Sequence, residues 1–148
     1  MDFASPSADW HQRLSDLSLA CAGAAGTEAG CLLRATRRLL SEAPAPWDSL
    51  FAGLPPREDC DALIAAGAEA AAALALVEGR GSYMISYGPG GQHLATVVFE
   101  GRSGEASAQG ANLALAVLGA LAASLAATGL GRAALRAKQV DQSALRLN

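Results

Sequence analysis

The sequence has few aromatic residues, few charged residues and an odd number of cysteines. Aromatic side chains make up 5% of the 148 residues and charged side chains 17%, whereas hydrophobic residues make up 51%. This composition excludes a disordered chain and is typical of a protein that folds without a partner. With so few aromatic rings, the core must consist mostly of Leu, Val and Ala. From its length we expect one domain over residues 1–148.

The cysteine pattern excludes a closed disulfide framework and a thiolate metal site. Cys21, Cys31 and Cys60 are widely spaced and form no CxxC pair. This pattern is typical of a reducing compartment. The N-terminal stretch MDFASPSADW has an acid where a secretory signal has cations, and no apolar run follows it. We therefore expect a cytoplasmic protein that holds no metal and no cofactor.

A surplus of positive charge is also missing. The net charge is −3, which argues against nucleic acid as the partner. The cations are nevertheless concentrated at the end, where residues 132–148 hold four of them and one acid. We predict a basic, peripheral C-terminal helix there, docked on its own chain or on a partner.

Residues 106–131 carry no charge and are numerous enough to span a bilayer. We expect instead a long apolar helix over 105–129 that stays out of the membrane. Its larger side chains fall on one helical face, Ala, Ser and Gly fill the other, and no aromatic belt marks its ends.

In the N-terminal half, apolar residues recur at helical spacing. Trp10, Leu14, Leu17 and Cys21 predict one helix after a flexible segment 1–8, with Asp9 as its cap. A second helix is expected after Thr27, and a third over residues 58–79. On the second helix, the spacing predicts that Cys31, Ala35 and Leu39 form the buried face. Arg34 and Arg38 then lie on a different face.

Residues 44–58 form a proline-rich connector with a short apolar face. The spacing i, i+3, i+4, i+7 places four large side chains together: Trp47, Leu50, Phe51 and Leu54. Two interpretations stay open, in which this face covers the chain's own core or docks into the groove of a protein partner.

Residues 82–99 are the only strongly β-favouring stretch and predict an antiparallel hairpin around GPGG. A four-residue loop would place Tyr83, Ile85 and Leu94 on one face, and Val97 and Phe99 on the other. Both faces would be apolar, and no other segment has a comparable strand composition. A lone two-stranded ribbon is marginal. We therefore expect a second copy of the chain to complete the sheet, with these five residues at the interface.

Motifs of known enzyme chemistry are missing from the sequence. It has no HExxH, no GxSxG and no GK[ST] after a glycine-rich loop. A polar group near the hairpin turn, Ser86, Tyr87 and His93, is the best candidate for ligand binding, with Trp47 and Phe51 as the roof of an apolar pocket. His93 is also the candidate for acid–base chemistry, and Cys60, near the start of a predicted helix, is the candidate nucleophile.

These observations predict an α+β fold, mostly helical, with one antiparallel hairpin packed against helices. The leading functional hypothesis is a non-enzymatic interaction or assembly protein that acts as a homo-oligomer. One alternative is a module that binds a small ligand near the hairpin. Another is a small enzyme that depends on Cys60 or His93.

Overall fold

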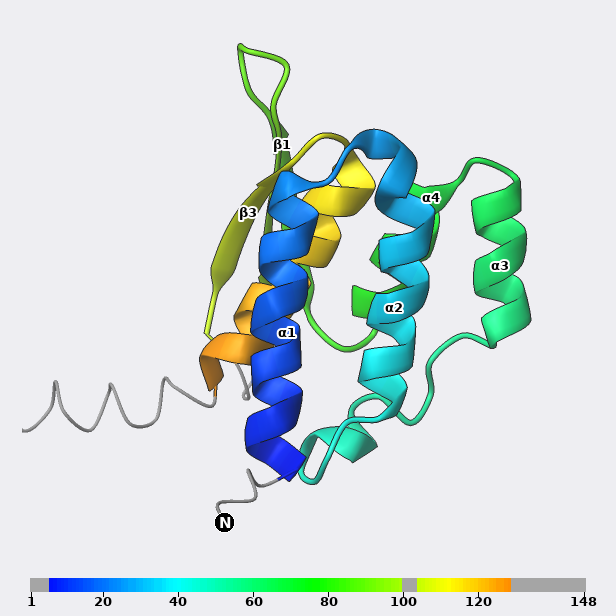
Figure 1. Ribbon diagram of the computed structural model, residues 1–148, viewed down its shortest axis with the longest axis vertical. Helices are drawn as coiled ribbons and strands as arrows, with labels where there is room; N and C mark the ends of the chain where they lie inside the picture. The colour runs from blue at the N-terminus through cyan, green and yellow to red at the C-terminus, as the bar shows by residue number, and fades with distance from the viewer. Residues whose placement is uncertain (1–5, 100–103, 129–148) are drawn as a thin grey trace, which may run out of the picture.

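The computed structural model describes residues 6–99 and 104–128, and it confirms the mostly helical α+β class (Figure 1). Its helices are α1 (Pro6–Gly23), α2 (Ala29–Ser41), α3 (Arg57–Ala65) and α4 (Glu69–Val77), with α5 over residues 113–128 of the described chain. Short 3-10 turns are η1 (Gly26–Glu28) and η2 (Trp47–Ser49). The strands are β1 (Ser82–Tyr87), β2 (His93–Val98) and β3 (Ala106–Gly110). The predicted basic helix at 132–148 lies outside the described residues.

Helix α1 has the predicted buried stripe. Trp10, Leu14, Leu17 and Cys21 are all buried. The helix begins earlier than expected, at Pro6, a residue whose fixed φ suits the first helical position. Residues 6–8 therefore belong to the helix and not to a flexible segment, whereas residues 1–5 lie outside the described residues.

Helix α2 buries only part of the face predicted. Leu39 is buried as expected, but Cys31 and Ala35 are exposed, and Leu33, Thr36 and Leu40 are buried in their place. The buried face thus carries three leucines, and these remove more apolar area from water than alanine and cysteine would. The Thr36 hydroxyl donates to the Leu32 carbonyl at 2.7 Å, so the burial leaves no polar group unpaired.

The single helix predicted over 58–79 is two helices, α3 and α4. Gly67 has φ +74°, a left-handed conformation that favours glycine and ends α3. Its amide donates to the Ile64 carbonyl at 3.0 Å, and the next amide, of Ala68, donates to the Leu63 carbonyl at 2.8 Å. These two bonds are the pattern of a Schellman cap, which turns the chain before α4 begins.

The hairpin is present, but its register differs by one residue from the prediction. The amide of Gly88 donates to the Gln92 carbonyl at 2.8 Å, which leaves three residues in the turn. Gly91, the last of these, has φ +81°, as a type I turn with a bulge requires. Tyr87 therefore pairs with His93 and Ile85 with Ala95. A one-residue shift moves every side chain of one strand to the opposite face.

A third strand, β3, pairs with β2 in antiparallel fashion and gives the sheet order β1-β2-β3. The prediction that no other segment extends the hairpin is therefore wrong, and α5 begins at residue 113 instead of 105. The strand sequence ASAQG has little β propensity. Its small residues allow close packing, because Ala108 and Cys21 of α1 both lie beside Gly119 of α5.

Helices cover one face of the sheet and leave the other open, so the prediction of two covered faces is also wrong. The inner face contributes Ala95 and Val97, both buried, and Phe99 follows in the core. Helix α5 is enclosed on all sides, since buried residues run almost without interruption from 114 to 126. The expected division of this helix into an apolar and a small-residue face is not observed. No helix among the described residues is long and apolar enough to cross a membrane.

Four aromatic rings connect α1, the connector and the end of the sheet. Trp10 lies 6.2 Å from Trp47 and 6.5 Å from Phe51 between ring centroids, and Phe51 lies 5.7 Å from Phe99. Trp47 and Phe51 are buried, and Leu50 and Leu54 pack against the same core. The apolar face of the connector thus covers the chain's own core, and it is not a free surface for the partner considered from the sequence.

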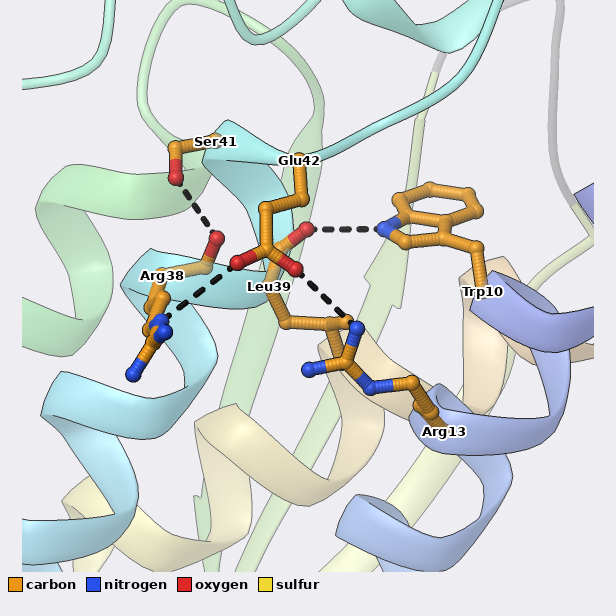
Figure 2. A network of polar contacts seen from close by, with 6 residues as sticks. All are labelled: Trp10, Arg13, Arg38, Leu39, Ser41 and Glu42. Carbon is orange, nitrogen blue, oxygen red and sulfur yellow. Dashed lines mark hydrogen bonds and ion pairs between the residues drawn. The ribbon is translucent and has the colours of Figure 1, made fainter. Parts of the chain in front are cut away.

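Polar contacts fasten α1 to the end of α2 (Figure 2). The indole N–H of Trp10 donates to the Leu39 carbonyl at 2.8 Å. On the surface beside it, the Glu42 carboxylate accepts from Arg13 at 3.0 Å and from Arg38 at 3.4 Å. Exposed pairs of this kind each contribute about 0.2–1 kcal/mol. These surface ion pairs therefore add little beside the buried indole bond, which joins α1 directly to α2.

Candidate functional site

Strand β1 is the most exposed apolar element of the described chain. All six of its residues are exposed, from Ser82 to Tyr87. Met84 and Tyr87 expose 71% and 69% of their surface, and Tyr83 and Ile85 each expose 39%. Figure 1 shows why, because the hairpin extends beyond the helices at the end where the turn lies. Contiguous apolar surface of this kind marks interaction sites in soluble proteins.

The free edge of β1 also presents backbone groups to solvent. Bonded and non-bonded pairs alternate along an antiparallel ladder, and Gly88 and Gln92 are bonded. Tyr87, Ile85 and Tyr83 then occupy non-bonded positions opposite β2, so their N–H and C=O groups point away from the sheet. At the other edge, β3 lies beside α1. Among the residues that the structure describes, the edge of β1 is thus the one at which another strand finds room.

Strand β1 lacks the features that usually protect an edge from pairing. Its sequence, SYMISY, has no lysine, no other charge and no proline. The ring of Tyr87 packs edge-on against that of His93, with centroids 5.0 Å apart, and this contact stiffens the end of the hairpin. The strand is therefore held in shape for pairing.

Known proteins give no guidance on this surface. No protein-family model, curated protein or solved structure matches the chain. Its function has to be inferred from its own residues.

The two halves of the predicted ligand pocket lie apart. Ser86, Tyr87 and His93 are close together at the turn end of the hairpin. Trp47 and Phe51 are buried in the aromatic cluster, and η2 lies at the opposite end of the molecule from the turn. The structure therefore does not form a pocket from these five residues.

The predicted interface residues divide in a similar way. Tyr83 and Ile85 are partly exposed on the inner face of β1, while Leu94 is half-buried on the outer face. Val97 and Phe99 are fully buried under the helices, so they are core residues in this structure. Met84 is highly exposed and was not among the predicted interface residues.

A second surface, missed from the sequence, is a groove between α2 and α3 with a volume of about 610 Å³. Three of its arginines come from α2 and one from α3: Arg34, Arg37, Arg38 and Arg57. The spacing i, i+3, i+4 of Arg34, Arg37 and Arg38 could have predicted that these three side chains lie on one face of a helix. Nothing in the sequence indicated that Arg57 would lie opposite them. We call this surface the arginine groove.

The buried thiols have environments that suppress their reactivity. Burial raises the pKa of Cys21 to about 11. Burial also raises the pKa of Cys60, and the Asp61 carboxylate raises it further, while Arg37 and Arg34 act weakly in the opposite direction. Cys31 is exposed. Within the described residues no three His, Cys, Asp or Glu side chains are grouped so as to hold a metal ion.

These environments predict selective labelling of one thiol. The thiolate is the reactive form, so a raised pKa lowers reactivity at neutral pH and shifts it to more alkaline pH. At pH 7.5 we expect iodoacetamide to modify Cys31 and to leave Cys21 and Cys60 unmodified, with all three reacting in denaturant. Peptide mass spectrometry measures each site. Rapid labelling of Cys60 in a folded Cys31→Ser variant would contradict this and favour a cysteine-dependent enzyme.

Proposed function

We propose that the protein is a non-enzymatic assembly protein whose copies join edge to edge through β1. The observation that carries the proposal is an uncharged edge strand whose six residues are all exposed and include four large apolar side chains. The expectation that the hairpin lacks any neighbour is not the support, because β3 supplies one. The unpaired edge of β1 supports it instead.

A two-fold axis allows β1 to pair with itself. Antiparallel pairing centred on Ile85 would place Ile85 opposite its own copy and Tyr83 opposite Tyr87 of the other chain. This register uses the outward backbone groups of all three residues on both chains. The product is a continuous six-stranded sheet in which the helices of both copies lie on the same side. Since β1 carries no charge, no like-charge repulsion opposes the pairing.

The side chains of β1 add to this backbone pairing. Paired aromatic and β-branched side chains each contribute about 0.2–1 kcal/mol across strands. In the proposed register, two Tyr–Tyr pairs flank one Ile–Ile pair on the inner face, and Met84 lies opposite Ser86 on the outer face. Part of the apolar surface that a single copy exposes at this edge would thereby be covered.

Charge at the symmetry centre should weaken the association. In an Ile85→Lys homodimer two ammonium groups would face each other, and the same holds for the carboxylates of Ile85→Glu. We expect each variant to raise the dissociation constant of the dimer roughly 30-fold, about 2 kcal/mol. An equimolar mixture of the two should associate again, because opposite charges then meet. Light scattering across a dilution series measures all three samples.

The matched control is Leu19→Lys, which replaces an apolar residue of α1 that is 72% exposed. This change should leave the association of the wild type intact. The proposal fails if the wild type is a monomer at every concentration, or if the mixture of the two Ile85 variants stays monomeric while both remain folded by circular dichroism.

A further inference from the structure

The arginine groove concentrates positive charge on a protein that is acidic as a whole. Four of the eleven Lys and Arg residues line it, against one acid, Asp61. The lining therefore carries three net positive charges, four minus one. Glu58 and Asp59, in the first turn of α3, are exposed and do not line the groove. Such a local reversal of sign raises the local concentration of anions.

The groove already holds one oxyanion between its two helices. The Asp61 carboxylate of α3 accepts from Nε of Arg34 at 2.9 Å and lies 3.8 Å from Nε of Arg57. Arginines from different helices thus converge on a single carboxylate. Each guanidinium has five N–H donors, and of these the contact with Asp61 uses one of Arg34, while Arg57 is close enough only for an ion pair. Planar forks of this kind match the oxygens of carboxylates and phosphates.

A backbone contact positions the third arginine. Nε of Arg37 donates to the Pro55 carbonyl at 2.9 Å, which fixes the side chain against the connector. The contact adds no negative charge, so the positive charge of Arg37 is not neutralised there. Arg38 forms its ion pair with Glu42, at the end of the groove toward α1. Arg37 is thus held in place by a contact that leaves its charge available to a ligand.

Charge and size together indicate the ligand class. A single phosphate group carries about −1.5 to −2 charges near pH 7, so a diphosphate matches the three arginines of the groove that are not paired with Glu42, namely Arg34, Arg37 and Arg57. The volume of about 610 Å³ lies in the range of small-molecule sites and exceeds the need of one phosphate ion. We infer that the arginine groove binds a small organic diphosphate, whose phosphates contact Arg34, Arg37 and Arg57 and whose organic part lies over Ala35.

Sodium pyrophosphate is the probe that tests this inference. Isothermal titration into the full-length protein should show saturable binding that sodium chloride of equal ionic strength does not reproduce. The double variant Arg37→Gln/Arg57→Gln should weaken it by about tenfold or more, since charge-assisted hydrogen bonds are lost from both helices. Arg13→Gln, which removes a cation outside the groove, should change the affinity less than about twofold.

A gain of binding separates the site from a simple loss of stability. Asp61 competes with the ligand for Arg34 and Arg57, so Asp61→Asn should tighten pyrophosphate binding several-fold, by about threefold to tenfold. The inference is overturned if pyrophosphate gives no saturable heat, or if the double arginine variant and Asp61→Asn both bind as the wild type does. Sodium citrate that binds as tightly as pyrophosphate would overturn the preference for phosphate.

The arginine groove and the β1 edge are independent surfaces. Figure 1 places α3 on the flank of the molecule away from the sheet. The Ile85→Lys variant should therefore bind pyrophosphate normally, and Arg37→Gln/Arg57→Gln should associate normally. Failure of one proposal is thus distinguishable from failure of the other.

Discussion

Replacing Trp10 by alanine should lower the free energy of unfolding by about 3–5 kcal/mol, the usual range for a large buried aromatic side chain. Trp10 is 2% exposed and contacts two rings of the connector, Trp47 and Phe51. Its loss leaves a cavity where α1, α2 and the connector meet. The melting temperature should fall by roughly 10 °C, measured by calorimetry or circular dichroism.

A graded series separates the ring from its hydrogen bond. Trp10→Phe keeps most of the apolar contact but removes the N–H that donates to the Leu39 carbonyl, so a smaller loss of about 1–2 kcal/mol is expected. That carbonyl still accepts from the Glu42 amide at 3.2 Å, which limits the cost. Leu19→Ala, on the exposed side of the same helix, should change stability by less than about 0.5 kcal/mol. Equal losses for Trp10→Ala and Leu19→Ala would contradict the aromatic cluster as the anchor of α1.

The elements with strong periodicity were predictable from the sequence. The stripe from Trp10 to Cys21 identified the buried face of α1, because a helix that covers a core repeats its apolar residues every three to four positions. The hairpin was equally clear, since Tyr, Ile and Val concentrate on either side of GPGG. These signals are local, and they hold whatever the rest of the chain does.

The features that depend on tertiary contacts were not predictable. β3 is made of Ala, Ser, Gln and Gly, which do not favour strands, and it exists because β2 and α5 provide partners for it. The division of the third helix depends on the left-handed conformation of Gly67, which a sequence allows but does not require. The register of the hairpin depends on whether three or four residues form the turn, and this choice decides which side chains are buried.

The candidate sites were likewise predictable in part, where a local sequence pattern indicated them, and not where they depend on tertiary contacts. Tyr83 and Ile85 were expected at an interface, and they do reach the surface of β1. Val97 and Phe99 were assigned to the same interface because the wrong register made both faces look equally apolar. The arginine groove draws on residues from position 34 to position 61, on two helices whose packing no local pattern specifies.

Gly110→Ala should be among the most destabilising single-methyl changes in this chain. A Cβ at this position would overlap the backbone nitrogen of Ala116 and lie 2.8 Å from the carbonyl carbon of Leu115. Backbone atoms in the first turns of a buried helix cannot move aside as a flexible side chain can. We expect a loss of about 3 kcal/mol or more, measured by urea unfolding, because overpacking against a fixed backbone forces strand and helix apart.

Two other glycines provide reference values for the loss of stability expected of Gly110→Ala. Gly23→Ala places its methyl group where no atom lies within 4 Å, so stability should stay unchanged or rise by about 0.4–1 kcal/mol. At Gly30 the new methyl would meet only the Cγ2 atom of Ile64, at 2.9 Å, and that side chain can rotate. For Gly30→Ala we therefore expect a loss of stability between that of Gly23→Ala and that of Gly110→Ala. If Gly110→Ala unfolds at the same urea concentration as Gly23→Ala, β3 is not packed directly on α5, and the sheet must meet its helices in some other arrangement.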